Sequence, residues 1–226
     1  MKLYVYEHCQ YCVRPRLVAD IKKIPLELIF LANDDERAHY DLVGKKLVPI
    51  LKKADGSCLL ESLDICNYLD KLTPDIKLAK TTQSDILTKL LDDVSSLSRE
   101  LIYPRTIYHP MNKKDFPTLS AQLYFKAKKE KINNRTFDDS LAQSKQFSLP
   151  LLEKLNEIAT TMKHQYISGD KFSYHDVITF PNLRRLTVAQ DVLTIPDKIM
   201  QYLTLISEQT HIELYPEFDF SQSLKI

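Results

Sequence analysis

A Cys-x-x-Cys pair, Cys9 and Cys12, follows an apolar run at residues 1–6 and leads directly into a helical pattern. This is the strongest constraint on the fold, because two cysteines at this spacing between a strand and a helix are typical of a redox-active dithiol. The chain has four cysteines in 226 residues, which is too few for a disulfide framework and fits a reducing, cytoplasmic compartment. Half of a zinc site is the alternative, but we find no second Cys/His pair with suitable spacing.

The first 72 residues alternate between strand and helix patterns. The order is strand, helix, strand, and then, after a short helix, two strands and a helix, which predicts a small mixed sheet in an α/β domain. The predicted strands are residues 2–6, 26–30, 50–53 and 57–60, with a turn at Asp55-Gly56. The predicted helices are residues 12–23, a short one capped within 33–35 and ending at 41, and 62–69.

Strand signals disappear after residue 72. We expect a linker at residues 73–84 and an all-α domain at residues 85–226. Its predicted helices are residues 86–103, 119–132, 136–166, 175–188 and 195–208. Prolines at 104, 110 and 117 are expected to punctuate a connection, and those at 150 and 181 to interrupt or kink helices.

Composition excludes several classes of function. The formal net charge is +1, which favours neither nucleic acid nor an anionic membrane as a partner. Three glycines argue against a Gly-rich nucleotide loop. The N-terminus shows no signal-peptide pattern, and no apolar run approaches the roughly 20 residues that span a bilayer.

Position assigns different roles to the two cysteines. Cys9 lies in the loop, near the unpaired N–H groups and the dipole of the helix, which stabilise a thiolate. Cys12 is one turn inside the helix, which fits a resolving thiol. Arg14 and Arg16 add positive charge nearby, and Glu7 opposes them.

Two further elements fit a groove beside the thiols. Pro49 follows Val48 at a strand entry; a cis bond there would present the preceding backbone to an extended peptide, although an ordinary strand-edge proline is the alternative. Ser62 is predicted as a helix N-cap that can also bind an anion. Cys58 and Cys66 are predicted to be buried, and His8 is predicted as a solvent-facing loop residue rather than a group that tunes Cys9.

With these motifs, the chain resembles the two-domain bacterial glutaredoxins, the glutaredoxin 2 family. The resemblance rests on residues 2–12, 43–51 and 61–65, and in the second half on residues 101–105 and 180–187. Ser173 to Asp176 is similar to the capping box of the glutathione-transferase helical domain.

The resemblance implies a thioredoxin-like domain joined to a glutathione-transferase-like helical bundle. It implies glutathione-dependent thiol–disulfide exchange, in which Cys9 attacks and Cys12 resolves. The implied glutathione-binding residues are Tyr11, Val48, Pro49, Glu61, Ser62 and Lys46. In this reading Val48 pairs with the cysteine backbone of glutathione, and Glu61 and Ser62 hold its γ-glutamyl end.

Some implications stay open at this point. Lys45, Lys46 and Arg37 are all candidates for the glycine carboxylate. The family's usual proline is replaced by Gln10, which we expect to shift the redox potential, with a shared iron–sulfur cluster as the alternative. The implied partners are glutathione and glutathionylated or disulfide-bearing proteins, with no nucleic acid, membrane or metal, and the chain is expected to be a monomer.

Two other classes share this architecture. One is a glutathione transferase that conjugates electrophiles, against which the intact Cys9/Cys12 pair argues. The other is a glutathione-binding module without this activity, either an iron–sulfur carrier or a relative of the channel-like proteins.

Overall fold

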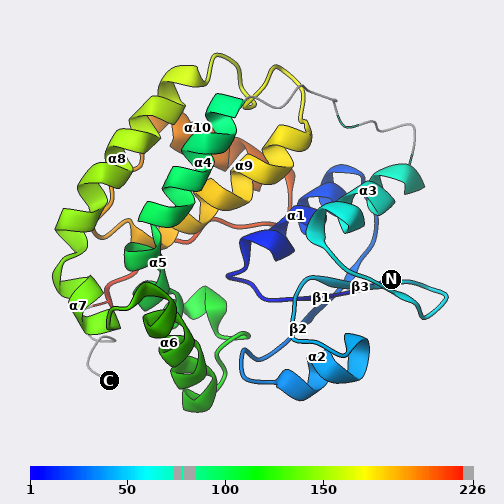
Figure 1. Ribbon diagram of the computed structural model, residues 1–226. Coiled ribbons are helices and arrows are strands. Elements are labelled where there is room, and N and C mark those ends of the chain that lie inside the picture. Colours follow the sequence, from blue (N-terminus) through cyan, green and yellow to red (C-terminus); the bar gives the residue numbers. More distant parts are fainter. Residues whose placement is uncertain (74–77, 79–84, 221–226) are drawn as a thin grey trace.

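The computed structural model describes residues 1–73, 78 and 85–220 (Figure 1). Of the predicted linker at residues 73–84, residues 74–77 and 79–84 lie outside the described residues. A small sheet with its helices lies on one side of the molecule, and a larger group of helices lies on the other (Figure 1).

The sheet is mixed, as predicted. Its order is β2-β1-β3-β4, with β1 and β2 parallel and the other neighbours antiparallel. Leu3, at the centre of the sheet, is paired with Leu28 on one side and Leu51 on the other. The strands are β1 (Lys2–Val5), β2 (Glu27–Phe30), β3 (Ile50–Lys52) and β4 (Cys58–Leu59).

Helices cover both faces of the sheet (Figure 1). α1 (Gln10–Ile21) and α3 (Ser62–Leu72) pack together on one face, and α2 (Glu36–Val43) lies on the other. The side chain of Asp35 caps α2 by accepting from the Ala38 N–H. The chain order is thus a βαβ unit followed by a ββα unit, which is the thioredoxin-like order. In this order α1 begins shortly after the end of β1.

The second half is helical. α9 is buried almost all round, because it packs against α1, α4 and α10. Its start is set by the predicted capping box, in which Ser173 and Asp176 bond reciprocally. The elements are α4 (Asp85–Leu97), α5 (Arg99–Thr106), η1 (Pro110–Asn112), α6 (Leu119–Asn133), α7 (Phe137–Ala142), α8 (Ser144–Thr161), α9 (Tyr174–Arg184), η2 (Arg185–Ala189) and α10 (Asp197–Gln209).

Several predicted helix boundaries were wrong. The helix predicted at residues 86–103 is broken at Ser98 into α4 and α5, and the one at 136–166 is broken at Gln143 into α7 and α8. Pro150 and Pro181, which were predicted to interrupt or kink helices, lie inside α8 and α9 and do not end them. Pro104, which was predicted in a connection, lies inside α5. A proline costs a helix one hydrogen bond, and tertiary packing of these helices offsets that cost.

The hydrophobic core is continuous between the two halves. One cluster of buried side chains includes Leu17 and Val18 of α1, Val94 of α4 and Phe180 of α9. Of the predicted apolar face of residues 86–101, Ile86 is 70 % exposed, so the face that packs inward is narrower than expected. None of the helices in the described part of the chain is long and apolar enough to cross a membrane.

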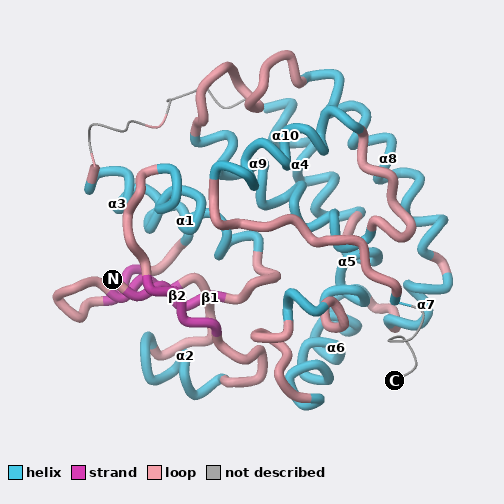
Figure 2. The backbone as a smooth tube through the Cα atoms, turned by 180° about the vertical axis from the view of Figure 1, so that it is seen from behind, coloured by secondary structure: helices cyan, strands magenta, loops and turns pink. Residues whose placement is uncertain are grey.

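The last described residues form an extended segment after α10. Residues 210–220 run across the back of the helical half, where they form the long loop in Figure 2. Arg184 donates to the Glu213 carbonyl, and Tyr215 Oη bonds Asn112 Oδ1 at 2.9 Å. These bonds attach the segment to α9 and η1.

Candidate functional site

The two cysteines of the pair differ in exposure. Cys9 is the N-cap residue of α1, and its carbonyl accepts from the N–H groups of Cys12 and Val13 at 3.0 and 3.2 Å. Its side chain is half-buried, whereas Cys12 is fully buried and accepts from the Tyr6 N–H at 3.4 Å. Of the pair, only Cys9 is partly accessible to solvent.

The acidities of the two thiols also differ. A hydrogen bond from the Cys12 thiol, the charge of His8 and the N–H groups of Cys12 and Tyr11 lower the Cys9 pKa to about 6, against the opposing effect of burial. Burial, together with the Cys9 thiolate, raises the pKa of Cys12. Near neutral pH the negative charge therefore resides on Cys9, the form that attacks disulfides.

His8 was predicted to face solvent, and this is wrong. Asp115, which is fully buried, accepts from the His8 Nδ1 at 2.6 Å and from the N–H groups of Glu7 and His8 at 2.9 and 3.0 Å. The imidazole ring is stacked on Tyr6 and Phe116. Because Asp115 lies more than one hundred residues away in the chain, no local pattern pointed to this partner.

Arg16 was predicted to add positive charge near the thiols, but its guanidinium forms an ion pair with Glu7. The buried Glu7 carboxylate pairs with Arg16 at 3.0 Å and with Arg184 of α9 at 2.6 Å. The two ion pairs place one carboxylate between two guanidinium groups within the interface between the halves. They hold the loop before Cys9 against α9.

Ser62 is the first residue of α3, not its N-cap. Glu61 occupies the N-cap with φ 64 and ψ 118, a left-handed conformation that is rare for a residue with a side chain. Arg14 donates to Ser62 Oγ at 3.2 Å, and its guanidinium lies 4.8 Å from the centre of the Tyr11 ring. The Arg14 Nε is buried and has no hydrogen-bond partner in the described part of the chain. Sequence analysis had assigned Arg14 only a general charge.

A cavity of about 410 Å³ opens beside Cys9, between the two halves of the molecule. It brings together the predicted residues Cys9, Tyr11, Lys46 and Val48, whereas Pro49, Glu61 and Ser62 are not among its lining residues. The complete lining is Tyr6, His8, Cys9, Gln10, Tyr11, Asn33, Lys46, Leu47, Val48, Ser95, Arg99, Tyr103, Phe125, Lys128, Lys129 and Arg185. The cavity is thus built from both halves around one reactive thiol.

The residues that precede β3 in the chain include Pro49 and the three basic candidates for the glycine carboxylate. The Val48–Pro49 peptide bond is cis. Lys46 donates to the Asn33 carbonyl at 2.5 Å and lies 3.7 Å from the Tyr124 ring centre. Lys45 and Arg37, the other candidates for the glycine carboxylate, are exposed and do not line the cavity.

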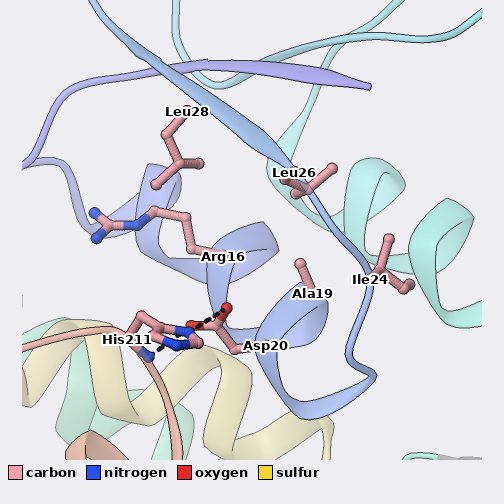
Figure 3. Close-up of a pocket in the computed structure, with 7 residues that line it drawn as sticks. All are labelled: Arg16, Ala19, Asp20, Ile24, Leu26, Leu28 and His211. Carbon is pink, nitrogen blue, oxygen red and sulfur yellow. Dashed lines mark hydrogen bonds and ion pairs between the residues drawn. The ribbon is translucent and has the colours of Figure 1, made fainter.

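The remaining thiols and a second cavity lie apart from this site. Cys66 is buried as predicted, whereas Cys58 is half-buried because β4 is a short edge strand. Figure 3 shows the second cavity, of about 180 Å³, where Asp20 and His211 face each other. It is lined by Arg16, Ala19, Asp20, Ile24, Leu26, Leu28 and His211, none of which carries a thiol.

Fold and site together define a class of protein: a two-domain thiol oxidoreductase with a thioredoxin-like domain and a glutathione-transferase-like helical domain. Residues 3–77 match the model of the glutathione S-transferase N-terminal domain, and residues 86–218 match that of the glutaredoxin 2 C-terminal domain. The chain is also 33 % identical to glutaredoxin 2 of Escherichia coli K12 over 214 residues, covering 95 % of this chain and 97 % of that protein. It belongs to the glutaredoxin 2 family and is a glutathione-dependent oxidoreductase.

Solved structures agree with this assignment. Glutaredoxin 2 of Salmonella typhimurium, in complex with glutathione, matches with a TM-score of 0.87 and 32 % identity, covering 100 % of this chain and 98 % of that one. A glutathione S-transferase of Ceriporiopsis subvermispora matches with a TM-score of 0.72 and 16 % identity over 96 % and 99 % of the chains. At that identity the second match shows the shared fold alone.

Proposed function

We propose that Cys9 is the nucleophile and that glutathionylated proteins are its substrates. The Cys9 thiolate attacks the glutathione sulfur of a protein–glutathione disulfide; the S–S bond breaks, and the protein leaves as a thiolate that takes a proton from water. A glutathione thiolate then attacks the mixed disulfide on Cys9. Glutathione disulfide is released and the Cys9 thiolate is restored.

Cys12 serves a second route, for disulfides within or between proteins. When Cys9 has formed a mixed disulfide with a protein, the Cys12 thiolate attacks the Cys9 sulfur and releases the protein thiol. The resulting Cys9–Cys12 disulfide is reduced by two glutathione molecules in succession. Burial keeps Cys12 protonated in the resting enzyme. Cys12 therefore reacts only after Cys9 has formed a mixed disulfide and no longer carries a negative charge.

Glutathione binds along the wall of the first domain. The backbone of Val48, held in place by the buried Pro49, pairs with the cysteine of glutathione, and Tyr11 lines the groove. Glu61 and Ser62 hold the γ-glutamyl end. We add Arg14 to this end, because its guanidinium contacts Ser62 and its buried Nε has a free donor for a carboxylate.

Lys46 is the basic residue proposed for the glycine carboxylate. It lines the same cavity as Cys9 and Val48, whereas Lys45 and Arg37 do not. We further propose that the first domain ends at residue 72 and the helical one begins at residue 85. The enzyme acts as a monomer in the cytoplasm, without a nucleic-acid or membrane partner and without a metal.

The observation that carries the proposal is the half-buried Cys9 with a pKa of about 6 beside the protonated, buried Cys12. The test is the glutathione-coupled reduction of a glutathionylated protein. Cys9→Ser should abolish turnover and Cys12→Ser should retain much of it. Cys58→Ser, which alters a free thiol outside the cavity, is the matched control and should behave as the wild type. Equal loss in the Cys9 and Cys12 variants would contradict the monothiol route.

A further inference from the structure

The helical wall of the active-site cavity is strongly basic. Arg99 of α5, Lys128 and Lys129 of α6, and Arg185 of η2 all line the cavity that contains Cys9. The whole chain carries a formal net charge of only +1, so this concentration of positive charge is local. Like charges that converge on one cavity repel each other, so this cavity favours anionic ligands beyond the single Cys9 thiolate that it holds.

Arg185 is held by neutral groups only. It donates to the Ser95 carbonyl at 3.2 Å and to Ser98 Oγ at 2.9 Å. Its Nε is buried and has no hydrogen-bond partner among the described residues. Burial lowers the Arg185 pKa to about 10, and the nearby Cys9 thiolate acts in the opposite direction.

Lys129 is held by aromatic rings. Its ammonium lies 4.4 Å from the centre of the Tyr103 ring and 5.3 Å from that of Phe125. Burial and the neighbouring cations lower its pKa. Within the described part of the chain, none of the four basic side chains forms an ion pair with a carboxylate.

The position of these groups indicates which part of the substrate they meet. Under the proposed function, on which this inference rests, glutathione occupies the opposite wall, along Tyr11 and Val48. The other half of the mixed disulfide, the protein chain that carries the modified cysteine, therefore enters beside the helical wall. Arginine and lysine there offer charge-assisted hydrogen bonds to carboxylates.

We propose that Arg99, Lys128, Lys129 and Arg185 form a subsite that selects substrates with acidic residues next to the glutathionylated cysteine. The two exposed members, Arg99 and Lys128, make the first contacts with such a segment. The half-buried pair, Lys129 and Arg185, supplies a fixed positive field beside Cys9. The preference is thus built into the second domain, which gives that domain a role in the choice of substrate.

The test uses three synthetic peptides glutathionylated on one cysteine, which differ only in flanking residues: glutamates, lysines or serines. The full-length enzyme is assayed with glutathione and a coupling system, and kcat/KM is compared. We expect the wild type to favour the acidic over the basic peptide by about tenfold, the scale of a few partly exposed charge pairs. Arg99→Gln/Lys128→Gln should reduce this ratio to about twofold, chiefly by lowering kcat/KM for the acidic peptide.

A matched control and salt make the test specific. Lys131→Gln changes an exposed lysine on the same helix outside the cavity, and should keep the wild-type ratio. Raising the ionic strength to about 1 M, where the Debye length is roughly 3 Å, should also bring the wild-type ratio toward one.

Each contrary result has one meaning. If the wild type turns over the serine peptide but shows no preference, the subsite is refuted and the proposed function stands. If the double variant keeps the preference but raises the KM for glutathione, the basic wall serves the incoming glutathione and the proposal is overturned. If the serine peptide is not turned over at all, the proposed function fails and the subsite fails with it.

Discussion

Replacing Cys12 by alanine should make Cys9 a weaker acid. The hydrogen bond from the Cys12 thiol is the largest of the effects that lower the Cys9 pKa. Cys12→Ala removes this donor, whereas Cys12→Ser keeps an O–H group at the same place. The two variants therefore separate the hydrogen bond from the redox role of Cys12, which both of them abolish.

The size of the effect follows from the strength of such a bond. A hydrogen bond to a charged group contributes about 1.5–3 kcal/mol, and one pKa unit corresponds to about 1.4 kcal/mol. Cys12→Ala should thus raise the Cys9 pKa from about 6 to roughly 7–8. At neutral pH the thiolate fraction then falls from about nine-tenths to between one-half and one-tenth.

The assay is the rate of Cys9 alkylation by iodoacetamide as a function of pH. Because only the thiolate reacts, the wild-type rate should be low in acid, rise through a midpoint near pH 6 and level off above it. A Cys9→Ser sample measures the background from Cys58 and Cys66. A midpoint in Cys12→Ala equal to that of the wild type would refute the role of the hydrogen bond, as would an equal rise in Cys12→Ser.

Three further outcomes are expected. His8→Asn should raise the Cys9 pKa in the same assay by about half a unit, less than Cys12→Ala, because the charge of His8 ranks below the thiol hydrogen bond. Arg184→Leu should lower the free energy of unfolding by about 3 kcal/mol in urea titration, because it removes the charge-assisted bonds to the Glu7 carboxylate and to the carbonyls of Glu7 and Glu213; a loss below about 1 kcal/mol would contradict the role of Arg184. Ser62→Ala should weaken glutathione binding about tenfold in calorimetry while the thermal midpoint stays nearly unchanged, and unaltered affinity would remove Ser62 from the glutathione site.

The shared core leads to one more expectation about unfolding. Side chains of α1 and α9 belong to one hydrophobic cluster, and Glu7 pairs with Arg184 across the interface. We expect a single cooperative transition for the whole chain, with the fragment 1–72 poorly soluble on its own. Two well-separated calorimetric transitions and a soluble, active fragment would contradict this.

Local pattern was sufficient to predict the sheet and the position of the thiol pair. The order of strands and helices over the first 72 residues defined the mixed sheet, and the spacing of Cys9 and Cys12 placed one at the helix start and the other inside it. The capping box at Ser173 was equally local, because its partner Asp176 lies three residues away.

Contacts between distant residues were not predictable from one sequence. His8 looked like a loop residue because its partner, Asp115, comes from the other half of the chain. The breaks at Ser98 and Gln143 were missed because the apolar periodicity continues across them. The basic wall was missed for a similar reason, since its members come from three separate elements.

The central claim is that Cys9 is the thiol that exchanges with glutathione, and trapping tests it most directly. The Cys12→Ser protein, which lacks the resolving thiol, is incubated with glutathione disulfide and analysed by intact mass and peptide mapping. One glutathione per chain, attached to Cys9 and formed with a pH midpoint near 6, is the predicted result. Glutathione attached to Cys58 or Cys66 with Cys9 left free would contradict the account.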